Sequence, residues 1–279
     1  ARDLTVYFNN VPVTLASGTA RSDQNGSFDN ITFKVPPQGA GTYDVKVRDS
    51  ANNTATAKTR FTISGTVTVS PTSGNVGTKI TASGTGFVPD SAVTIKYDDK
   101  QIATTTVLSD GTFSTKFAAP ASKGGNHTVT VSGTMTKQFT FAMESSAPPV
   151  PVPAEPADGS ESKPQVSFDW QDVTDPSLPV TYVLQVGSNR NLTSVMLEKK
   201  GLSTSEYTLT EDEQLPAVKK EAPYYWRVKA VDSASNDSDW STPRSFYVGF
   251  VFELTGWVLY TLIAIGGLIA MLIGFLLGR

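Results

Sequence analysis

The C-terminal end of the sequence carries the feature that most restricts how the chain can fold. Residues 254–278 contain no charged side chain, and Arg279 closes the run. At about 1.5 Å of helix rise per residue, such a run is long enough to cross the ~30 Å hydrocarbon core of a bilayer. We therefore expect residues 249–279 to form one transmembrane helix, with the rest of the chain folded outside the bilayer.

The flanks of this run predict its orientation. Arg279 follows it, whereas Glu253 and the acidic residues between positions 232 and 239 precede it. Because basic residues favour the cytoplasmic side of a membrane, we expect a single-pass protein of the cell membrane. Its C-terminus would lie in the cytoplasm and its N-terminal domains outside the cell.

Small residues recur at every fourth position of the run, at Gly266, Ala270, Gly274 and Gly278. This spacing places them along one side of a helix, where they let the backbone of another helix approach closely. The sequence therefore predicts a helix-packing face. The alternative is background composition, since glycine is common in membrane helices in general.

Before residue 249 the sequence is rich in short segments that alternate apolar and polar residues. Val166, Phe168 and Trp170 alternate in VSFDW, and Tyr224 and Trp226 begin a longer alternation in YYWRVKAVD. A period of two predicts half-buried strands of a two-sheet sandwich. About 250 residues are too many for one small sandwich, so we expect an all-β fold of three domains in tandem.

The first two domains are copies of one another. The stretch SDQNGSFDNITFKVPPQGAGTYDVKVRD at residues 22–49 matches SDGTFSTKFAAPASKGGNHTVTVSG at residues 109–133. Further along, the strand FTI at Phe61 matches FTF at Phe139. An internal repeat of this kind predicts that the two domains share one strand plan.

The second copy, residues 65–144, has an opening that the first copy lacks. This opening, residues 67–87, contains two strand-like segments, VTVS and KITASG, separated by a cluster of turn residues. A sandwich without them leaves strand edges and an apolar sheet face uncovered. Residues 1–64 are therefore expected to form an incomplete sandwich whose missing strands lie upstream in a longer protein.

A proline-rich segment, SSAPPVPVPAEP at residues 145–156, separates these copies from a third domain. Its composition favours polyproline II and predicts a semi-rigid linker. The third domain, residues 157–248, does not share the repeat and is expected to be a sandwich of another type.

The block SPTSGNVGTKITASGTGF at residues 70–87 resembles the opening of IPT/TIG-type immunoglobulin-like domains, and the SDxxGSF…VP pattern is similar to cell-surface repeats of bacteria and archaea. In the third domain, Trp170, Leu215 and the stretch WSTPRSFYV resemble a fibronectin type III domain. The first resemblance implies immunoglobulin-like sandwiches. The second implies that Trp170 is a buried core residue and that Tyr224 is the tyrosine-corner residue.

Charge and cysteine content narrow the class of protein. The net charge is -3 and the isoelectric point is about 5.3, so no basic face is expected and nucleic acid is excluded as a partner. There is no cysteine. Because immunoglobulin-like domains of animal receptors usually carry an inter-sheet disulfide, its absence favours a prokaryotic surface protein.

No catalytic or cofactor-binding residues stand out. His127 is the sole histidine of the sequence, so a catalytic triad or a zinc site would depend on it. It aligns with Tyr43 of the first copy, and Tyr224 occupies a comparable place in the third domain. We therefore expect a structural ring at the start of a late strand, and a protein that is not an enzyme.

Clusters of Asp and Asn occur where hairpins must turn, and turn formation is the main interpretation of them. A calcium site, which needs hard oxygen ligands, is the alternative, and its best candidates are Asp232, Asp237 and Asp239. Glycosylation sequons form a further set of candidate sites, at Asn25, Asn30, Asn52, Asn126, Asn191 and Asn236.

These observations favour a non-enzymatic, membrane-anchored surface protein that acts as a stalk, an adhesin or an envelope-layer component. The alternative is an accessory single-pass subunit whose sandwiches cap the outer face of a membrane complex. A carbohydrate-binding module of a surface enzyme is a third reading. Partners would be the membrane, other proteins bound through the helix and the sandwich loops, and further copies of this chain.

Replacing Gly274 with Leu is expected to weaken association of the predicted helix with its partners, because the larger side chain fills the contact. Leu272→Ala, on another face, is the matched control and should matter less. The measurement is the population of oligomer or complex in mild detergent, with membrane insertion unchanged. Equal effects of the two variants would contradict a packing face.

Overall fold

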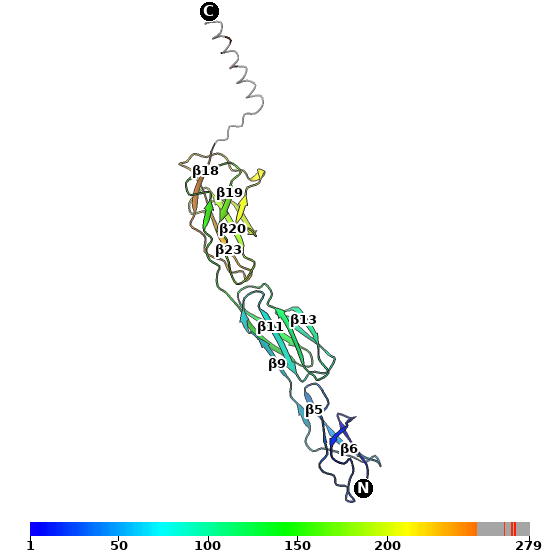
Figure 1. Cartoon of the computed structure of the whole chain (residues 1–279). Coiled ribbons are helices and arrows are strands. Elements are labelled where there is room, and N and C mark those ends of the chain that lie inside the picture. The colour runs from blue at the N-terminus through cyan, green and yellow to red at the C-terminus, as the bar shows by residue number, and fades with distance from the viewer. Residues whose placement is uncertain (250–264, 266–268, 270, 272–279) are drawn as a thin grey trace, which may run out of the picture. The chain divides into compact units, whose positions relative to one another are not determined.

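A computed structural model describes residues 1–249, 265, 269 and 271. These residues form two compact units, whose strands follow one another from blue to orange in Figure 1. Unit 1 comprises residues 1–147 together with the loops Asp175–Pro179 and Asp232–Asn236. Unit 2 comprises the other described residues from Pro148 onward.

The predicted transmembrane helix and its small-residue stripe, Gly266, Ala270, Gly274 and Gly278, lie outside the described residues. Within the part of the chain that the structure does describe, no helix combines the length and the apolar character needed to cross a membrane.

The second sandwich is complete and starts at Thr66, close to the expected position. A three-stranded sheet, in the order β14-β11-β9, faces a five-stranded sheet in the order β10-β16-β15-β12-β13, in which β10 runs parallel to β16. The strands are β9 (Thr66–Ser70), β10 (Ser73–Gly74), β11 (Lys79–Thr85), β12 (Ala92–Tyr97), β13 (Lys100–Thr106), β14 (Phe113–Ala118), β15 (Gly125–Ser132) and β16 (Thr136–Met143).

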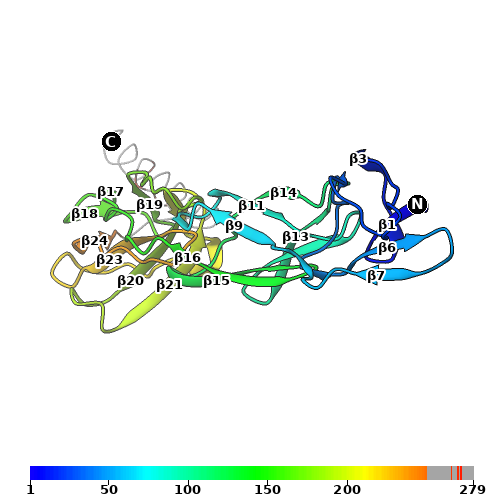
Figure 2. The same cartoon turned by 90° about the horizontal axis from the view of Figure 1, so that it is seen from below.

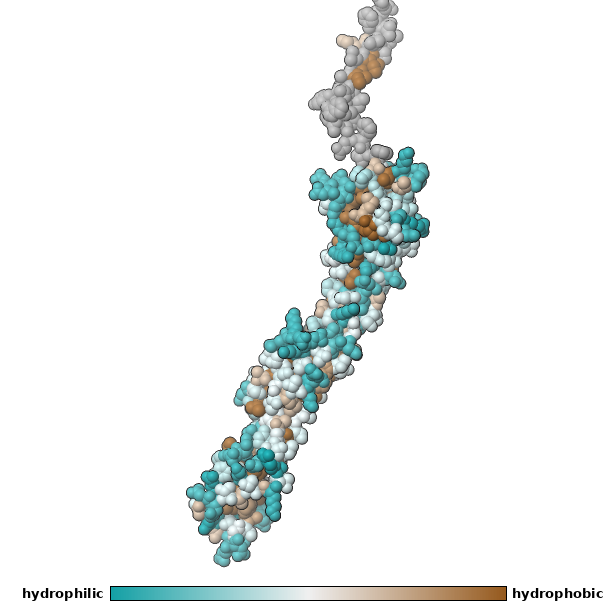
Figure 3. Space-filling view, turned by 180° about the vertical axis from the view of Figure 1, so that it is seen from behind, coloured by the Kyte–Doolittle hydropathy of each residue, from teal (hydrophilic) through white to brown (hydrophobic). Residues whose placement is uncertain are grey.

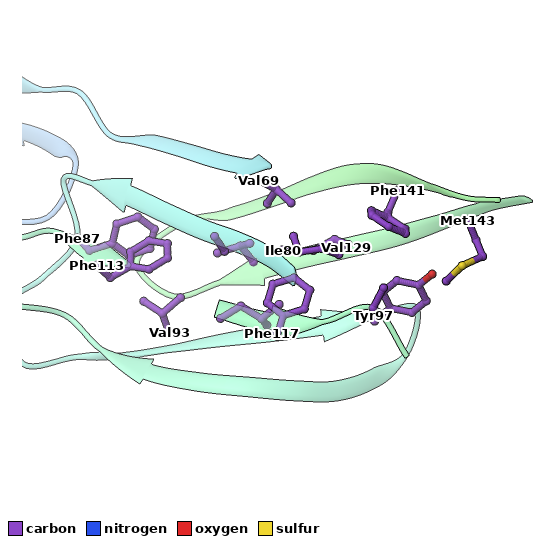
Figure 4. Close-up of a cluster of buried hydrophobic side chains, with 14 of the residues drawn as sticks. Val69, Ile80, Phe87, Val93, Tyr97, Phe113, Phe117, Val129, Phe141 and Met143 are labelled. Atoms are coloured by element: carbon purple, nitrogen blue, oxygen red, sulfur yellow. The ribbon is translucent and has the colours of Figure 1, made fainter. Parts of the chain in front are cut away.

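Alternate residues of these strands fill the space between the two sheets. Ile80 and Ala82 of β11 are fully buried, as are Val93 and Ile95 of β12. Figure 4 shows Phe87 beside Phe113 at one end of this core, and their ring centroids lie 4.8 Å apart in an edge-to-face arrangement. Such pairs add to the burial of apolar area, so they hold the two sheets in register.

The first sandwich follows part of the same plan. Its main sheet has the order β2-β1-β6-β7, and β3-β4 and β5-β8 form two further, separate strand pairs. Figure 2 shows β1, β6 and β7 together near the N-terminus. The strands are β1 (Leu4–Phe8), β2 (Val11–Pro12), β3 (Leu15–Ser17), β4 (Thr32–Phe33), β5 (Gly41–Tyr43), β6 (Val45–Asp49), β7 (Thr54–Thr56) and β8 (Phe61–Ile63).

Residues 1–64 are all described, and they contain no counterpart of β9, β10 or β11. The first sandwich thus lacks the strands that open the second, and the expectation that they lie upstream stays a prediction. One detail of the alignment is wrong. Tyr43 pairs with Phe61 as His127 pairs with Phe141, so Phe61 corresponds to Phe141 and not to Phe139.

The third sandwich repeats the arrangement of the second. A sheet in the order β17-β19-β22 faces a sheet in the order β18-β24-β23-β20-β21, with β18 parallel to β24. A short 3₁₀ helix, η1 (Glu211–Glu213), follows β22. The strands are β17 (Pro153–Glu155), β18 (Ser160–Ser162), β19 (Ser167–Trp170), β20 (Thr181–Gly187), β21 (Val195–Leu202), β22 (Glu206–Thr208), β23 (Tyr224–Val231) and β24 (Arg244–Val248).

The two ring positions expected from the fibronectin resemblance are confirmed. Trp170 is 2% exposed and meets Tyr182 edge to face. The Tyr224 hydroxyl donates a hydrogen bond to the Pro216 carbonyl at 3.0 Å, which is the contact expected of a tyrosine corner. The expected linker is corrected in one respect, because β17 lies inside residues 145–156. Proline is tolerated there because β17 is an edge strand.

Trp170→Ala is expected to lower the free energy of unfolding of unit 2 by about 3–5 kcal/mol, because it leaves a large cavity in the core. Trp170→Phe fills more of the space and should cost clearly less. Urea unfolding followed by circular dichroism measures both. A loss below about 1 kcal/mol for the alanine variant, typical of surface positions, would contradict the core assignment.

Candidate functional site

An aromatic ring at the start of a late strand recurs in all three sandwiches. Tyr43, His127 and Tyr224 each bond to a backbone carbonyl upstream, namely Gly39 at 2.5 Å, Lys123 at 2.7 Å and Pro216 at 3.0 Å. Two tyrosines and one histidine make the same contact. The contact therefore needs only a flat ring that carries a hydrogen-bond donor, and it does not need the acid–base chemistry of an imidazole. The expectation that His127 is structural agrees with this geometry.

Both ring nitrogens of His127 face acceptors. Nε2 lies against the Lys123 carbonyl, and Nδ1 lies 2.8 Å from the Asp98 carboxylate, while the ring stacks on Tyr97. Burial disfavours the charged ring, but the hydrogen bonds to Lys123 and Asp98 outweigh it, so the pKa of His127 is raised. Since two acceptors require two N–H donors, the imidazolium fits best, and no ring nitrogen is left for a base or a metal ligand.

Asp98 is the partner that secures this ring. Its other oxygen accepts a hydrogen bond from the Thr128 backbone amide at 3.0 Å. Burial opposes ionisation of Asp98, but the bonds from Thr128 and His127 prevail and lower its pKa. The pair therefore ties the turn after β12 to the beginning of β15.

Three carboxylates meet in unit 1. Oxygen atoms of Glu144, Asp175 and Asp232 lie within 4.8 Å of one another, and Asp232 is buried. Two of these residues belong to the loops Asp175–Pro179 and Asp232–Asn236, and the third follows β16. Among the described residues, none of the three forms an ion pair with a basic side chain.

Neutral donors satisfy this acidic cluster. Ser177 donates to Glu144 at 2.6 Å, and Asn236 donates its backbone amide and its side-chain amide to the two oxygens of Asp232 at 2.7 and 2.8 Å. Burial raises the pKa of Asp232, and the charges of Glu144 and Asp175 raise it further, against the effect of the Asn236 bonds. Carboxylate oxygens at this spacing are of the kind that hard cations prefer.

The predicted calcium ligands are not brought together. Asp232 lies in the cluster, but Asp237 is paired with Lys229, and Asp239 is outside the group of carboxylates found among the described residues. The sequence interpretation missed Glu144 and Asp175 because they lie far from position 232 in the chain. Calcium binding by any of these carboxylates stays a prediction.

The outer face of the main sheet of unit 2 carries a half-buried aromatic residue, Trp240. Arg227 lies over the Trp240 ring at 4.3 Å and Lys229 at 5.2 Å from its centroid. Arg227 also donates to Gln185 at 2.8 and 3.0 Å, and Gln185 donates to Glu198. Because two cations engage the indole, Trp240 is held in a structural network.

Apolar side chains are also exposed on the surface of the described residues. Figure 3 shows one face of the chain, on which hydrophobic residues lie scattered among hydrophilic ones. In unit 2 the exposed apolar residues include Val150, Val152, Val195 and Met196. Scattered residues of this kind are normal for soluble proteins.

Five of the six sequon residues are exposed: Asn25, Asn30, Asn52, Asn126 and Asn191. Asn236 differs, because it is half-buried and its side-chain nitrogen donates to Asp232 and, at 3.4 Å, to Glu144. A glycan on that nitrogen would break these bonds. The structure therefore separates Asn236 from the accessible sequons.

Comparison with known families agrees with the sandwich topology. The IPT/TIG domain family matches residues 66–143, and the family described as the Rha78A-like N-terminal immunoglobulin domain matches residues 154–251. The chain is thus built of tandem immunoglobulin-like and fibronectin III-like domains. A search of curated proteins finds no match.

Solved structures with similar folds include three multidomain β-proteins. The fibronectin(III)-like modules of Clostridium thermocellum CbhA are 15% identical, and the match covers 67% of this chain and 94% of that chain with a TM-score of 0.29. The FN1–FN3 domains of chicken CNTN1 are 12% identical, and the match covers 89% of this chain and 91% of that chain with a TM-score of 0.31. Domains A168–A170 of titin are 14% identical, and the match covers 88% of this chain and 89% of that chain with a TM-score of 0.28.

The raised pKa of His127 predicts how the stability of unit 1 depends on pH. The charged ring adds to the free energy of unfolding. This stabilisation should be fully present below 6.5, the ordinary pKa of histidine, and should be lost as the pH rises through the higher pKa of His127 in the folded protein. His127→Tyr, which copies Tyr43, keeps the ring and a donor but does not titrate in this range. Thermal unfolding between about pH 5.5 and 9 should show a decline in the wild type that the variant lacks. Parallel curves would contradict the charged ring.

Proposed function

We propose that this chain is a non-enzymatic, membrane-anchored cell-surface protein whose tandem sandwiches act as a stalk or adhesin. Domains of this kind are typical of cell-surface and adhesion proteins, and the matched families are the IPT/TIG domain and an N-terminal immunoglobulin domain. The anchor is the apolar run at residues 254–278 of the sequence.

The observation that carries this proposal is how the polar groups of the sandwiches are used. Both nitrogens of His127 are bonded, the Trp240 ring is covered by two cations, and the carboxylates of the acidic cluster accept neutral donors. These groups stabilise loops and strand ends. Such a framework supports binding by exposed loops, which is where sandwich proteins carry specificity.

The proposal includes the absence of catalysis. A nucleophile–base pair requires a free basic nitrogen or an activated carboxylate within hydrogen-bond reach of a reacting group. The sole histidine of the sequence is engaged on both sides, which supports a binding or spacing role over an enzymatic one.

Deleting residues 250–279 is expected to release the protein from cells that express it behind a secretion signal, because the apolar run is its anchor. The intact chain should stay with the membrane fraction and be cut by protease added outside the cell. Retention of the deleted form on the membrane would contradict the anchor, and a chain protected from external protease would contradict surface display.

Native purification in mild detergent separates the stalk from the accessory-subunit alternative. A stalk should migrate alone or with further copies of itself. Fixed stoichiometry with other membrane proteins would support the subunit instead, and would favour the predicted stripe as the contact.

A further inference from the structure

The main sheet of the first sandwich carries a small cleft with a basic lining. The cleft has a volume of about 340 Å³. Its lining combines one aromatic, two basic and three neutral polar side chains, namely Tyr7, Lys46, Arg48, Asn10, Thr54 and Thr56. No carboxylate lines it. The cleft is therefore a local cationic patch on a chain whose net charge is -3.

Strand register gathers this lining on one face of the sheet. Tyr7 of β1 lies opposite Lys46 of β6, and Lys46 lies opposite Thr56 of β7. Arg48, two residues further along β6, lies opposite Thr54. Because strand residues alternate between faces, these five side chains share a face, and those directly opposite stand about 5 Å apart. Figure 2 shows the three strands together.

The two cations of the cleft have no carboxylate partner. Three acidic residues of the first sandwich pair with other arginines, in the ion pairs Asp49–Arg2, Asp3–Arg21 and Asp44–Arg60. Among the described residues, Lys46 and Arg48 form no ion pair. Lys46 donates one hydrogen bond, to the Asn10 side-chain oxygen at 2.9 Å. Arg48 lies over the Tyr7 ring, 5.3 Å from its centroid. Both side chains thus keep charged donors for an anion.

The second sandwich shows that the fold does not need these cations. By the alignment of the repeat, Thr130 and Ser132 of β15 occupy the positions of Lys46 and Arg48. With these neutral residues, β15 still pairs with β12 on one side and with β16 on the other. The two cations are therefore an addition in the first sandwich and not a requirement of the sheet.

The face is also independent of the strands that the first sandwich lacks. In the second sandwich, which has those strands, Lys96 lies opposite Thr130 as Tyr7 lies opposite Lys46. Lys96 is exposed there, and so is Gln138, the other residue opposite Thr130. A complete sandwich thus leaves this face of its main sheet turned to solvent.

The chemistry of the cleft favours a sugar over a peptide. The hydroxyls of Thr54 and Thr56 and the amide of Asn10 can both donate and accept hydrogen bonds, which suits the hydroxyls of a sugar ring. A bound peptide usually needs a strand edge or apolar pockets. Neither is present at the cleft, because β1 and β6 are paired on both sides in the order β2-β1-β6-β7 and the lining is polar.

We propose that the outer face of β1, β6 and β7 binds an acidic saccharide, meaning a sugar that carries a carboxylate on its ring. Lys46 and Arg48 bind the carboxylate through charge-assisted hydrogen bonds, and Thr54 and Thr56 bind ring hydroxyls. This binding requires neither the membrane anchor nor surface display. Its failure would leave the proposed function standing.

Titration calorimetry of the full chain in mild detergent, at low salt, tests the ligand class. The probe is a trimer of galacturonic acid, and its controls are a trimer of galactose and an amidated aspartate tripeptide. The acidic trimer should bind about tenfold or more tightly than either control, because only this probe has both carboxylates and ring hydroxyls. Equal binding of the peptide would overturn the saccharide, and equal binding of the neutral trimer would overturn the role of the cations. Absence of binding by the acidic trimer would overturn the site.

Substitutions test the location of the site. Lys46→Gln and Arg48→Gln should each weaken binding of the acidic trimer by about tenfold and leave thermal unfolding unchanged, because both side chains face solvent. Lys96→Gln removes the same charge from the corresponding face of the second sandwich and should have no effect. Equal weakening by all three variants would overturn the proposal, since net charge would then explain the binding.

A further variant keeps every charge. Thr56→Val removes a hydroxyl but preserves the branched shape of the side chain, so the sheet should be unaffected. It should weaken the acidic trimer by about threefold and leave binding of the aspartate tripeptide unchanged. Unchanged binding of the acidic trimer to this variant would contradict the contact between Thr56 and the sugar ring.

Discussion

The burial of every second side chain between two sheets is the constraint on which this structure depends. Tyr224, Trp226, Val228 and Ala230 of β23 all face the core of the third sandwich, and the residues between them face outward. Because strand residues alternate between faces, each sheet needs a second layer on one side. The second and third sandwiches each have this second layer as a three-stranded sheet, whereas the first sandwich has only two short strand pairs in addition to its main sheet.

The first sandwich shows what happens when part of the second layer is missing. Its core shrinks to Val6 and Phe8 as buried apolar residues, and Phe8 is surrounded by the rings of Phe33, Tyr43 and Phe61. The four-stranded sheet keeps its register because hydrogen bonds between neighbouring strands do not need the opposite layer. Side-chain burial does need it, so aromatic residues become exposed while the strand pairing persists.

Several details could be predicted from the sequence because they depend on local pattern. The resemblance to fibronectin type III domains placed the rings of Trp170 and Tyr224 correctly, and the repeat identified His127 as the equivalent of Tyr43. The register of Phe61 was wrong by two residues, since a shift of two keeps the same face and leaves the apolar pattern unchanged. The strand β17 was missed because prolines are compatible with both a linker and an edge strand.

The sequence by itself determined the all-β class, the repeat and the ring positions, because a period of two and a duplicated pattern are properties of neighbouring residues. Only the tertiary structure decided which acidic residues meet. Asp232 was a candidate beside Asp237 and Asp239, yet it lies with Glu144 and Asp175. It also decided that Asn236 is engaged and that Phe28 is exposed. Those outcomes depend on contacts between loops and layers far apart in the chain, which no local pattern encodes.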